Sequence, residues 1–247
     1  MNKTILVTGS AKGIGRAIIL EFAKVGYNCI INFNTSKEEA LKLKDEVEKM
    51  GAKALAIKCD VSDEAEVDAM FKVIEKDFGG VDILVNNAAI DQPNVFSKKT
   101  VEDFKKILDV NLIGAYIVSK RASKYMLDNK WGRIINISST NGMNTYYPMC
   151  LEYDASKAAL NSLTHNLAIQ FAPFINVNAI APGFIGTSSE IDGYDEEFMK
   201  IELDKILLHR FGEAEEVAHL AFFLASDDAA YINNTIIRID GGQYGSE

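Results

Sequence analysis

The sequence is poor in the residues that form disulfide frameworks or metal sites. Its 247 residues include only three cysteines and three histidines. The cysteines, Cys29, Cys59 and Cys150, are odd in number, and no two of them have a metal-binding spacing. No two histidines have the spacing of ligands on one helix. We therefore expect no metal site and no disulfides, and a reducing, cytoplasmic location.

Basic runs and long hydrophobic runs are missing as well. Lys and Arg number 26 against 35 Asp and Glu, so the formal net charge is −9. Nucleic acid and anionic membrane surfaces are therefore not expected as partners. No apolar run approaches the ~20 residues of a membrane-spanning helix. The apolar stretch that ends at Gly9 is too short for a signal peptide.

The chain does contain a regular alternation of short β-branched runs and longer helical patterns. The expected strands are Thr4–Thr8, Asn28–Phe33, Ala54–Lys58, Ile83–Asn86, Arg133–Ser138, Asn176–Ile180 and Thr235–Ile239. The expected helices are Ile14–Val25, Ser36–Met50, Asp63–Phe78, Leu151–Phe171 and Glu213–Ala225, together with a long helical stretch, Thr100–Asn129, that Gly114 interrupts. Ser36 and Glu39 have the spacing of a capping box. Residues 181–201 form the only long irregular stretch, which is where we expect a covering loop.

This order predicts an α/β fold. Most expected strands are apolar throughout, as strands buried on both faces should be. We predict a Rossmann-type, doubly wound parallel sheet of about seven strands with helices on both faces. The sequence has no linker, internal repeat or low-complexity segment, so residues 1–247 are expected to form a single domain.

A glycine-rich loop, T-G-S-A-K-G-I-G at residues 8–15, follows the first expected strand. Gly9 permits a tight turn, Gly13 lets the backbone approach a pyrophosphate, and Gly15 lets the helix pack closely. The following helix N-terminus offers free N–H groups to phosphates. An ordinary glycine turn is the alternative, but a strand-to-helix junction is the context that a dinucleotide loop requires.

Tyr153 and Lys157 stand four residues apart in a stretch without Gly or Pro, so a helix places them on one face. Taken alone, a half-buried tyrosine beside a solvated lysine explains the pair. However, a free phenol has a pKa near ~10, and a nearby ammonium favours its ionised form. The pair is therefore also a candidate for proton transfer near neutral pH.

The glycine loop and the Tyr-x-x-x-Lys segment together resemble the short-chain dehydrogenase/reductase family, from Thr8 to Gly242. Further markers of that family occur in the expected order: Asp60-Val61, Asn86-Asn87-Ala88-Ala89, Asn111, Ser138-Ser139, Pro182-Gly183 and Thr187. Two departures stand out. Ala89 replaces the usual glycine, and the interval from Ser139 to Tyr153 is one residue longer than usual. Either Ser138 or Ser139 could therefore carry the catalytic hydroxyl, and we favour Ser139.

The resemblance implies an oxidoreductase that interconverts a carbonyl and a secondary alcohol by hydride transfer. It assigns proton transfer to Tyr153, hydrogen bonding of the substrate oxygen to Ser139, and support of Tyr153 and the nicotinamide ribose to Lys157. Asn111 would anchor a water that passes protons to Lys157. The implied cofactor contacts are Gly9, Ser10, Lys12, Gly13, Ile14, Gly15, Asn34, Thr35, Ser36, Asp60, Val61, Asn87, Ala88, Ala89, Tyr153, Lys157, Pro182, Gly183, Ile185 and Thr187. The family also implies a homotetramer, with Thr100–Asn129 and Leu151–Phe171 at one interface.

The end of the second expected strand favours NADP(H). NAD-preferring relatives place a carboxylate there to bind the ribose 2′-hydroxyl. Here Phe33 takes that position, and no carboxylate follows until Glu38. A 2′-phosphate would instead meet positive charge from Lys12 and Lys37 and hydrogen-bond donors from Asn34, Thr35 and Ser36.

The segments expected to wall the substrate site, 143–150 and 184–208, favour an apolar substrate. They contain Met143, Tyr146, Tyr147, Met149, Phe184, Ile185, Ile191, Tyr194, Phe198 and Met199. A sugar would need many paired polar groups in the wall. A sugar or polyol dehydrogenase remains the alternative, and a non-catalytic dinucleotide sensor is a more remote one.

Within the family the chain is most similar to bacterial 3-oxoacyl-carrier-protein reductases. Carrier proteins are acidic, and the covering region carries acidic residues of its own: Glu190, Asp192, Asp195, Glu196 and Glu197. These would repel a carrier, and Lys130 and Arg133 compensate only in part. We therefore predict reduction of small or medium apolar ketones, including 3-oxoacyl thioesters, without strong dependence on the carrier.

Overall fold

The structure is a computed structural model that describes residues 2–187 and 196–244. Within these residues, seven strands form one sheet: β1 (Thr4–Val7), β2 (Asn28–Phe33), β3 (Ala54–Lys58), β4 (Ile83–Asn86), β5 (Gly132–Ile137), β6 (Ile175–Pro182) and β7 (Ile236–Ile239). Their order is β3-β2-β1-β4-β5-β6-β7, and all pairs are parallel. The predicted sheet is confirmed. The strand order reverses between β1 and β4, which is where such folds open a crevice.

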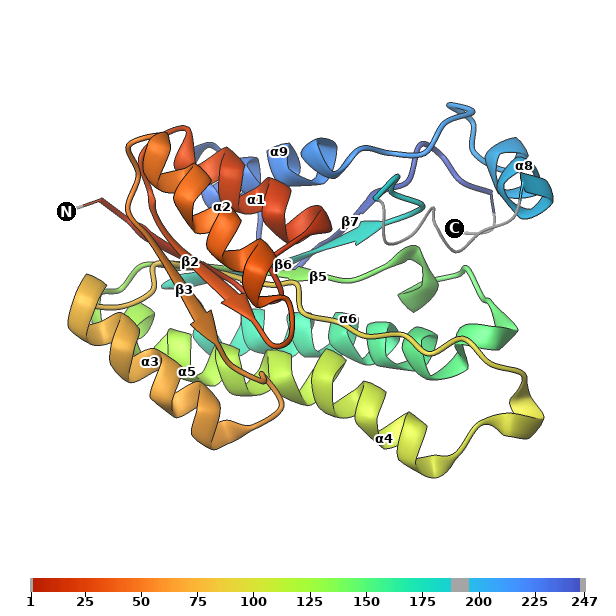
Figure 1. Ribbon diagram of the computed structural model, residues 1–247, viewed down its shortest axis with the longest axis horizontal. Helices are drawn as coiled ribbons and strands as arrows, with labels where there is room; N and C mark the ends of the chain where they lie inside the picture. The colour runs from red at the N-terminus through yellow and green to blue at the C-terminus, as the bar shows by residue number, and fades with distance from the viewer. Residues whose placement is uncertain (1, 188–195, 245–247) are drawn as a thin grey trace.

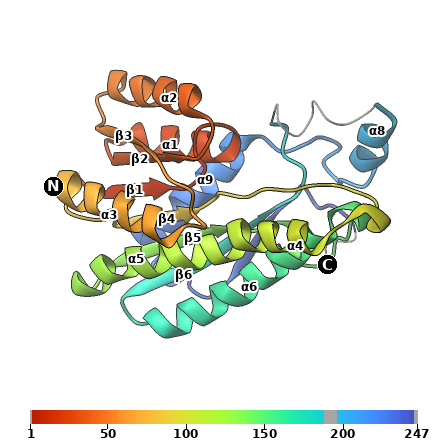
Figure 2. The ribbon, with the colours of Figure 1, turned by 60° about the horizontal axis from the view of Figure 1, so that its bottom comes forward.

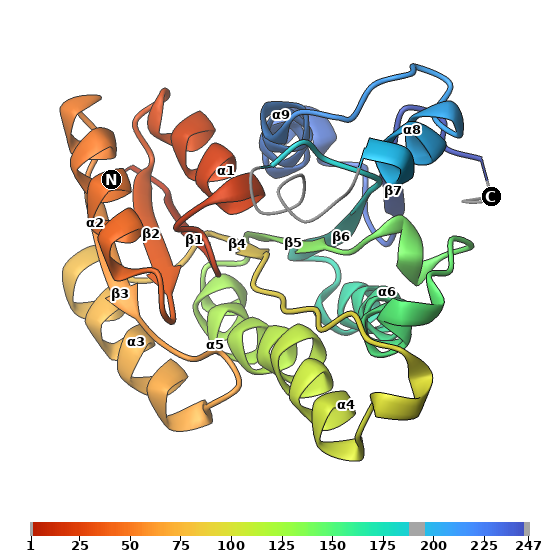
Figure 3. The same ribbon diagram turned by 45° about the vertical axis from the view of Figure 1, so that its right-hand side comes forward.

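Helices cover both faces of the sheet (Figures 1 and 3). One layer consists of α1 (Gly13–Ala23), α2 (Lys37–Lys49) and α9 (Ala214–Ala225). The other consists of α3 (Glu64–Phe78), α4 (Val101–Leu108), α5 (Ala115–Asp128) and α6 (Leu151–Phe171). Figure 2 shows α4, α5 and α6 side by side, with α8 (Glu196–Asp204) apart from both layers.

Each face of the sheet has its own apolar core. In β1, Ile5 and Val7 pack into the cluster with α1 and α9, whereas Leu6 packs into the cluster with α3 and α5. This alternation follows from the period of two in a strand. Because both faces are buried, β1, β2, β4 and β5 are buried at every position. This is why these strands appear in the sequence as largely apolar runs and not as alternating apolar and polar residues.

The helical stretch 100–129 is interrupted at Gly114, as predicted: two helices are joined by a π-helical segment, Asp109–Gly114. A Cβ on Gly114 would lie 2.7 Å from Val61 Cγ2, so this turn packs too closely for a larger residue. One expectation about element boundaries is wrong: the stretch 181–201 is not irregular throughout, since β6 continues to Pro182 and α8 begins at Glu196. Residues 188–195 lie outside the described part of the chain.

The predicted capping box at Ser36 is also wrong. Ser36 precedes α2, but its side chain makes no capping hydrogen bond. Its backbone has φ −82° and ψ 61°, unlike the extended N-cap residues of the helices that do have capping bonds. Capping boxes form instead at Thr100 with Asp103 on α4, and between two glutamates at the start of α9. The Ser36 hydroxyl therefore stays available to the adjoining pocket.

The cysteines are unreactive thiols. Cys29 and Cys59 are buried, and Cys150 is half-buried. Burial raises the pKa of each thiol to about 12, so the thiolate is scarce at neutral pH. Among residues 2–187 and 196–244, no group of three or more His, Cys, Asp and Glu side chains is arranged to hold a metal. None of the described helices is long and apolar enough to cross a bilayer.

Candidate active site

The glycine loop joins β1 to α1 at the crevice. Gly9 has φ +60°, and a Cβ there would lie 2.8 Å from Ala88 Cα. A Cβ on Gly15 would lie 2.6 Å from Asn87 Nδ2. The loop is therefore a cradle that only glycine can line at these two positions. The N-terminus of α1 has no side-chain cap and no acidic residue in its first turn. Its N–H groups remain available to an anion.

A hydrogen-bonded pair fixes this loop against the segment after β4. Thr8 Oγ1 accepts from Asn87 N (2.9 Å) and Ala88 N (3.0 Å). In return, Asn87 Nδ2 donates to the Thr8 and Gly9 carbonyls at 2.9 and 3.0 Å. The two segments on either side of the crevice are thus held in register, and the shape of the cradle is set before any ligand binds.

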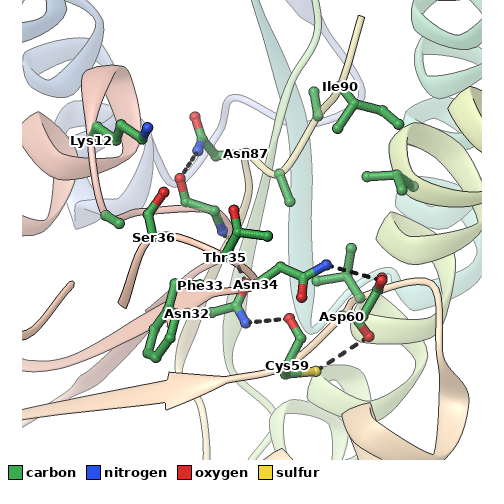
Figure 4. Close-up of a pocket in the computed structure, with 16 residues that line it drawn as sticks. Lys12, Asn32, Phe33, Asn34, Thr35, Ser36, Cys59, Asp60, Asn87 and Ile90 are labelled. Carbon is green, nitrogen blue, oxygen red and sulfur yellow. Dashed lines mark hydrogen bonds between the residues drawn. The ribbon is translucent and has the colours of Figure 1, made fainter. Parts of the chain in front are cut away.

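A pocket of about 280 Å³ opens beside the loop (Figure 4). Ten of the residues expected to bind cofactor line it: Gly9, Lys12, Asn34, Thr35, Ser36, Asp60, Val61, Asn87, Ala88 and Ala89. Phe33 also lines it, at the position where NAD-preferring relatives place an acid. Lys37 does not line the pocket. Ala11, Asn32, Cys59, Ile90 and Val110 complete the lining and were missed from the sequence.

Asn32 was the most consequential omission. It is fully buried in β2, where Oδ1 accepts from Gly9 N at 3.0 Å and Nδ2 donates to Cys59 O at 3.0 Å. It thereby ties the glycine loop to the end of β3. The available signal was a polar residue inside an otherwise apolar strand, because a buried amide must find partners.

Among the described residues that line the pocket, Asp60 is the one carboxylate. Oδ1 accepts from Ser62 N (3.0 Å) and Ser62 Oγ (2.6 Å), and Oδ2 accepts from Asn34 Nδ2 (3.0 Å). Burial raises the pKa of Asp60, but the hydrogen bonds from Ser62 and Asn34 outweigh it and the pKa is lowered. The Asp60 carboxylate is therefore ionised, and both of its oxygens already accept hydrogen bonds. Asn34 donates one of these bonds with one of its two side-chain N–H groups (Figure 4).

The other expected cofactor residues surround the pocket without lining it. Ser10 is fully buried and its N–H donates to Asn32 O at 2.9 Å, so it supports the loop from beneath. Gly13 and Ile14 begin α1. Pro182 ends β6, Gly183 N donates to Ile239 O, and Ile185 is buried. A Cβ on Gly13 would lie 3.7 Å from Thr187 Cγ2, so the segment after β6 reaches the glycine loop.

Tyr153 and Lys157 lie one turn apart on α6, as the spacing indicates. Lys157 Nζ is 5.3 Å from the centre of the Tyr153 ring and donates to Ile137 O at 2.7 Å. Lys157 is only 2% exposed, so it is not the solvated lysine of the alternative interpretation. Burial lowers its pKa to about 8. Tyr153 is half-buried.

The structure distinguishes the two serines after β5. Ser138 is buried, and its Oγ donates to Asn161 Oδ1 at 2.6 Å. Ser139 is half-buried and caps the short turn Thr140–Gly142, accepting from Asn141 N at 3.1 Å. Its hydroxyl proton therefore remains free for another acceptor. The geometry favours Ser139 as the residue that meets a substrate.

Asn111 lies buried in the π-helical segment. Its side chain accepts from Ile90 N (2.8 Å) and donates to Ile90 O (2.9 Å) and Ser156 Oγ (3.0 Å). Ser156 in turn donates to Tyr153 O at 2.7 Å. The asparagine thus joins the segment after β4 to the turn of α6 that carries Tyr153. A π-helical turn inside a long helix often marks a functional site.

Aromatic side chains, most of them from the segments expected to wall the substrate site, pack around Phe184. The Phe184 ring lies 6.0 Å from Tyr147, 6.1 Å from Phe198 and 5.7 Å from Phe211, centre to centre. Tyr147 Oη donates to Glu202 Oε2 on α8 at 2.7 Å. Ile191 and Tyr194, also expected in this wall, lie outside the described residues. Phe211 was not expected there.

Over almost its whole length the chain is similar to known reductases and dehydrogenases. A family model described as "Enoyl-(Acyl carrier protein) reductase" matches residues 9–243. The 3-oxoacyl-[acyl-carrier-protein] reductase FabG of Staphylococcus aureus (strain Mu50) is 39% identical over 245 residues, covering 99% of both chains. The 3β-hydroxysteroid dehydrogenase 1 of Eggerthella lenta is 37% identical, covering 97% of this chain and 93% of the relative.

Solved structures give the same result. A 3-oxoacyl-[acyl-carrier protein] reductase from Brucella melitensis superposes with a TM-score of 0.90 at 30% identity, covering 98% of this chain and 91% of that one. A 7α-hydroxysteroid dehydrogenase, solved with NADH and 7-oxo glycochenodeoxycholic acid, superposes with a TM-score of 0.93 at 30% identity, covering 99% and 95%.

Proposed function

The chain belongs to the short-chain dehydrogenase/reductase family of oxidoreductases acting on CH–OH groups, and from that premise we propose that it is an NADPH-dependent ketone reductase. The proposed substrates are small or medium apolar ketones, 3-oxoacyl thioesters among them. One observation carries the proposal. Lys157 is buried beneath Tyr153 on α6, and the Ser139 turn packs on the same helix.

The residues of the crevice fit a dinucleotide. A Cβ on Gly9 would collide with Ala88, and the uncapped start of α1 offers N–H groups to a pyrophosphate. Asp60 and Val61 would hold the adenine. Lys12, Thr35 and Ser36 would hold a 2′-phosphate, since Phe33 stands where an acid would repel it. Lys157 would hold the nicotinamide ribose, and Thr187 the nicotinamide end.

The bound cofactor supplies the hydride, and the protein handles the proton. Tyr153 donates its phenol proton to the carbonyl oxygen during reduction and accepts it back during oxidation. The Lys157 ammonium stabilises the phenolate left behind. Ser139 donates its free hydroxyl proton to the same substrate oxygen and stabilises the charge that develops there. We assign Asn111 to a water that returns protons toward Lys157.

The walls support an apolar substrate. Phe184 contacts Tyr147, Phe198 and Phe211, and sugar hydroxyls would find few partners on these rings. The two hydroxysteroid dehydrogenase relatives act on apolar ring systems, so cyclic ketones belong in the test set. The proposal includes a cytoplasmic homotetramer in which residues 1–247 form one domain.

The deciding experiment follows NADPH absorbance with 3-oxoacyl thioesters, cyclic ketones and sugars, together with titrations of NADPH and NADH. We expect turnover of ketones, none of sugars, and tighter binding of NADPH. In Lys12→Gln the affinity for NADPH should fall about tenfold, and that for NADH should not change, because one charge-assisted contact to the 2′-phosphate is lost. Equal affinities in the parent enzyme would refute the NADPH preference.

A further inference from the structure

Asp154 follows the proposed acid–base residue, yet the mechanism above makes no use of it. Its side chain is directed into the protein, and the residue is only 9% exposed. Both carboxylate oxygens are engaged: Oδ1 accepts from Asn141 Nδ2 at 2.7 Å, and Oδ2 accepts from Tyr147 N at 3.1 Å. A buried carboxylate is costly unless such donors compensate for the loss of water.

Both donors belong to the chain between β5 and α6. Asn141 also donates its backbone N–H to Ser139 Oγ, so it joins Asp154 directly to the proposed substrate-binding serine. A second bond from α6, Asn161 Nδ2 to Gly142 O at 2.9 Å, holds the other end of the same turn. A Cβ on Gly142 would lie 2.6 Å from the Lys157 backbone, so the turn rests closely on the helix.

Tyr147 extends these contacts to α8. Its backbone N–H binds Asp154, and its hydroxyl donates to the buried Glu202. Lys205 Nζ donates to the other oxygen of Glu202 at 2.7 Å. A continuous set of hydrogen bonds therefore runs from α8 through Tyr147, Asp154 and Asn141 to Ser139.

The region around Asp154 has little other regular structure. Between β5 and α6 the chain forms only the short 3₁₀ turns Thr140–Gly142 and Pro148–Cys150. Without ties to α6, the turn that begins at Ser139 would be held only at its β5 end, where Ser138 N donates to Ile180 O. Displacing a catalytic group by about 1 Å can cost on the order of a hundredfold in rate, so such ties matter to catalysis.

We propose that Asp154 is a positioning residue that holds the Ser139 turn on α6, beside Tyr153, and joins this turn to α8 through Tyr147. The catalytic part of this inference rests on the proposed function, because it treats Ser139 as the substrate-binding serine. The structural part does not depend on it.

A double-mutant cycle tests the proposal. Asp154→Asn keeps the shape of the side chain. Asn141 and Tyr147 both donate to this position, but an amide has only one acceptor oxygen and its other group is a donor. One of the two hydrogen bonds is therefore lost. In the double variant, Asn141→Asp with Asp154→Asn, the amide now at position 154 donates to the carboxylate now at position 141. The oxygen of the same amide still accepts from Tyr147 N. The double variant should therefore recover what each single variant loses. Asp128→Asn, on the exposed end of α5, is the matched control.

Two readouts separate the parts of the proposal. We expect kcat in Asp154→Asn to fall about tenfold or more, with the KM for NADPH within about twofold, and kcat in the double variant to return to within about threefold of the parent. Amide hydrogen exchange across 139–142 and at Tyr147 should accelerate in the single variant and recover in the double variant. A parent-like single variant, or a loss that the double variant does not restore, would overturn the proposal.

Two further outcomes are distinguishable. If the parent reduces no ketone, the proposed function fails, while hydrogen exchange still decides whether Asp154 holds the turn. If Asp154→Asn does not fold, Asn141→Ala replaces it, because Asn141 is half-exposed and contributes the same hydrogen bond. Parent-like kcat and exchange in that variant would also overturn the proposal.

Discussion

At the residue scale, the proposed role of Tyr153 depends on a single group, its phenol hydroxyl. Tyr153→Phe removes the hydroxyl and leaves the ring over Lys157. We expect turnover to fall by about 10²–10⁴, because proton transfer by a positioned side chain contributes that much. The affinity for NADPH should stay within about twofold, as the ribose contacts of Lys157 remain. Turnover and cofactor titration should be measured on the same preparation. Appreciable turnover in this variant would remove Tyr153 from the mechanism.

The buried Lys157 makes stability depend on pH. Burial lowers its pKa to about 8 from the ordinary 10.5, so between these values the unfolded chain binds more protons than the folded one. Stability from this residue therefore rises with pH across that window, and the cost of burying the ammonium is fully present below it. Relative to Lys157→Met, the parent should gain up to about 3 kcal/mol between pH 7.5 and 10.5.

Denaturant unfolding of both proteins, from pH 7.5 to 10.5, measures this difference. Subtracting the two curves cancels the other titrating groups that both share. A difference that stays constant with pH would mean that Lys157 keeps its ordinary pKa inside the protein.

Much of the residue-level geometry could be predicted, and the limits have physical causes. The spacing of Tyr153 and Lys157 places them on one helix face whatever the rest of the fold does. The choice between Ser138 and Ser139 could not be settled, because it depends on Asn161, which a distant turn of α6 brings to Ser138. The apolar neighbours of Asn32 mark it as a buried polar residue, but its partners, like those of Asp154, come from distant parts of the sequence and could not be predicted.

At the element scale, the helix starts give a paired prediction. Asp63 caps α3, where Oδ1 accepts from Ala65 N and Glu66 N. Asp63→Ala should lower the free energy of unfolding by about 1 kcal/mol. Ser36→Ala should lower it by less than about 0.5 kcal/mol, because Ser36 makes no capping bond, yet it should weaken NADPH binding. Urea unfolding and cofactor titration of both variants check the pair. Equal losses of stability would show that Ser36 does cap α2.

Element types were easier to predict than their detailed form. The strands were recognisable because burial on both faces demands continuous apolar runs. Gly114 indicated an interruption of the long helical stretch, but not its π-helical form, because Gly114 packs there against Val61, a contact between distant parts of the chain. Helix α8 was missed because its acidic residues fall in the stretch of sequence that was expected to form a covering loop. Its packing depends on Phe198 meeting Phe184 and on Glu202 meeting Tyr147.

At the scale of the whole molecule, parallel topology gathers the site. The segments that follow β1, β2, β3, β4, β5 and β6 all leave the same edge of the sheet, so residues far apart in sequence meet there. The order of motifs was enough to predict this convergence. The electrostatic character of the surface around the site is a separate property, since it depends on which charges α8 presents. Glu196, Glu197 and Asp204 of α8 are exposed.

That acidic surface predicts how the enzyme treats a carrier-bound substrate. An acidic carrier approaching α8 meets like charges, which slow association most at low salt. We expect the parent to use a 3-oxoacyl group on a short thiol and on carrier protein with kcat/KM values within about tenfold. Glu196→Lys with Glu197→Lys should raise kcat/KM for the carrier-bound substrate alone, by about three- to tenfold at low salt, and the gain should shrink at moderate salt.

The matched control is Glu75→Lys with Asp77→Lys. This pair makes the same change of charge at the exposed C-terminal end of α3, which leads into the amino end of β4 and so lies at the sheet edge opposite the site. It should leave unchanged the ratio of kcat/KM for the carrier-bound substrate to kcat/KM for the short-thiol substrate. If the control pair raised the ratio equally, net charge would be responsible and not the position of α8. If the parent favoured the carrier-bound substrate by orders of magnitude at low salt, the acidic surface would not govern substrate choice, because like charges at the entrance cannot accelerate that encounter.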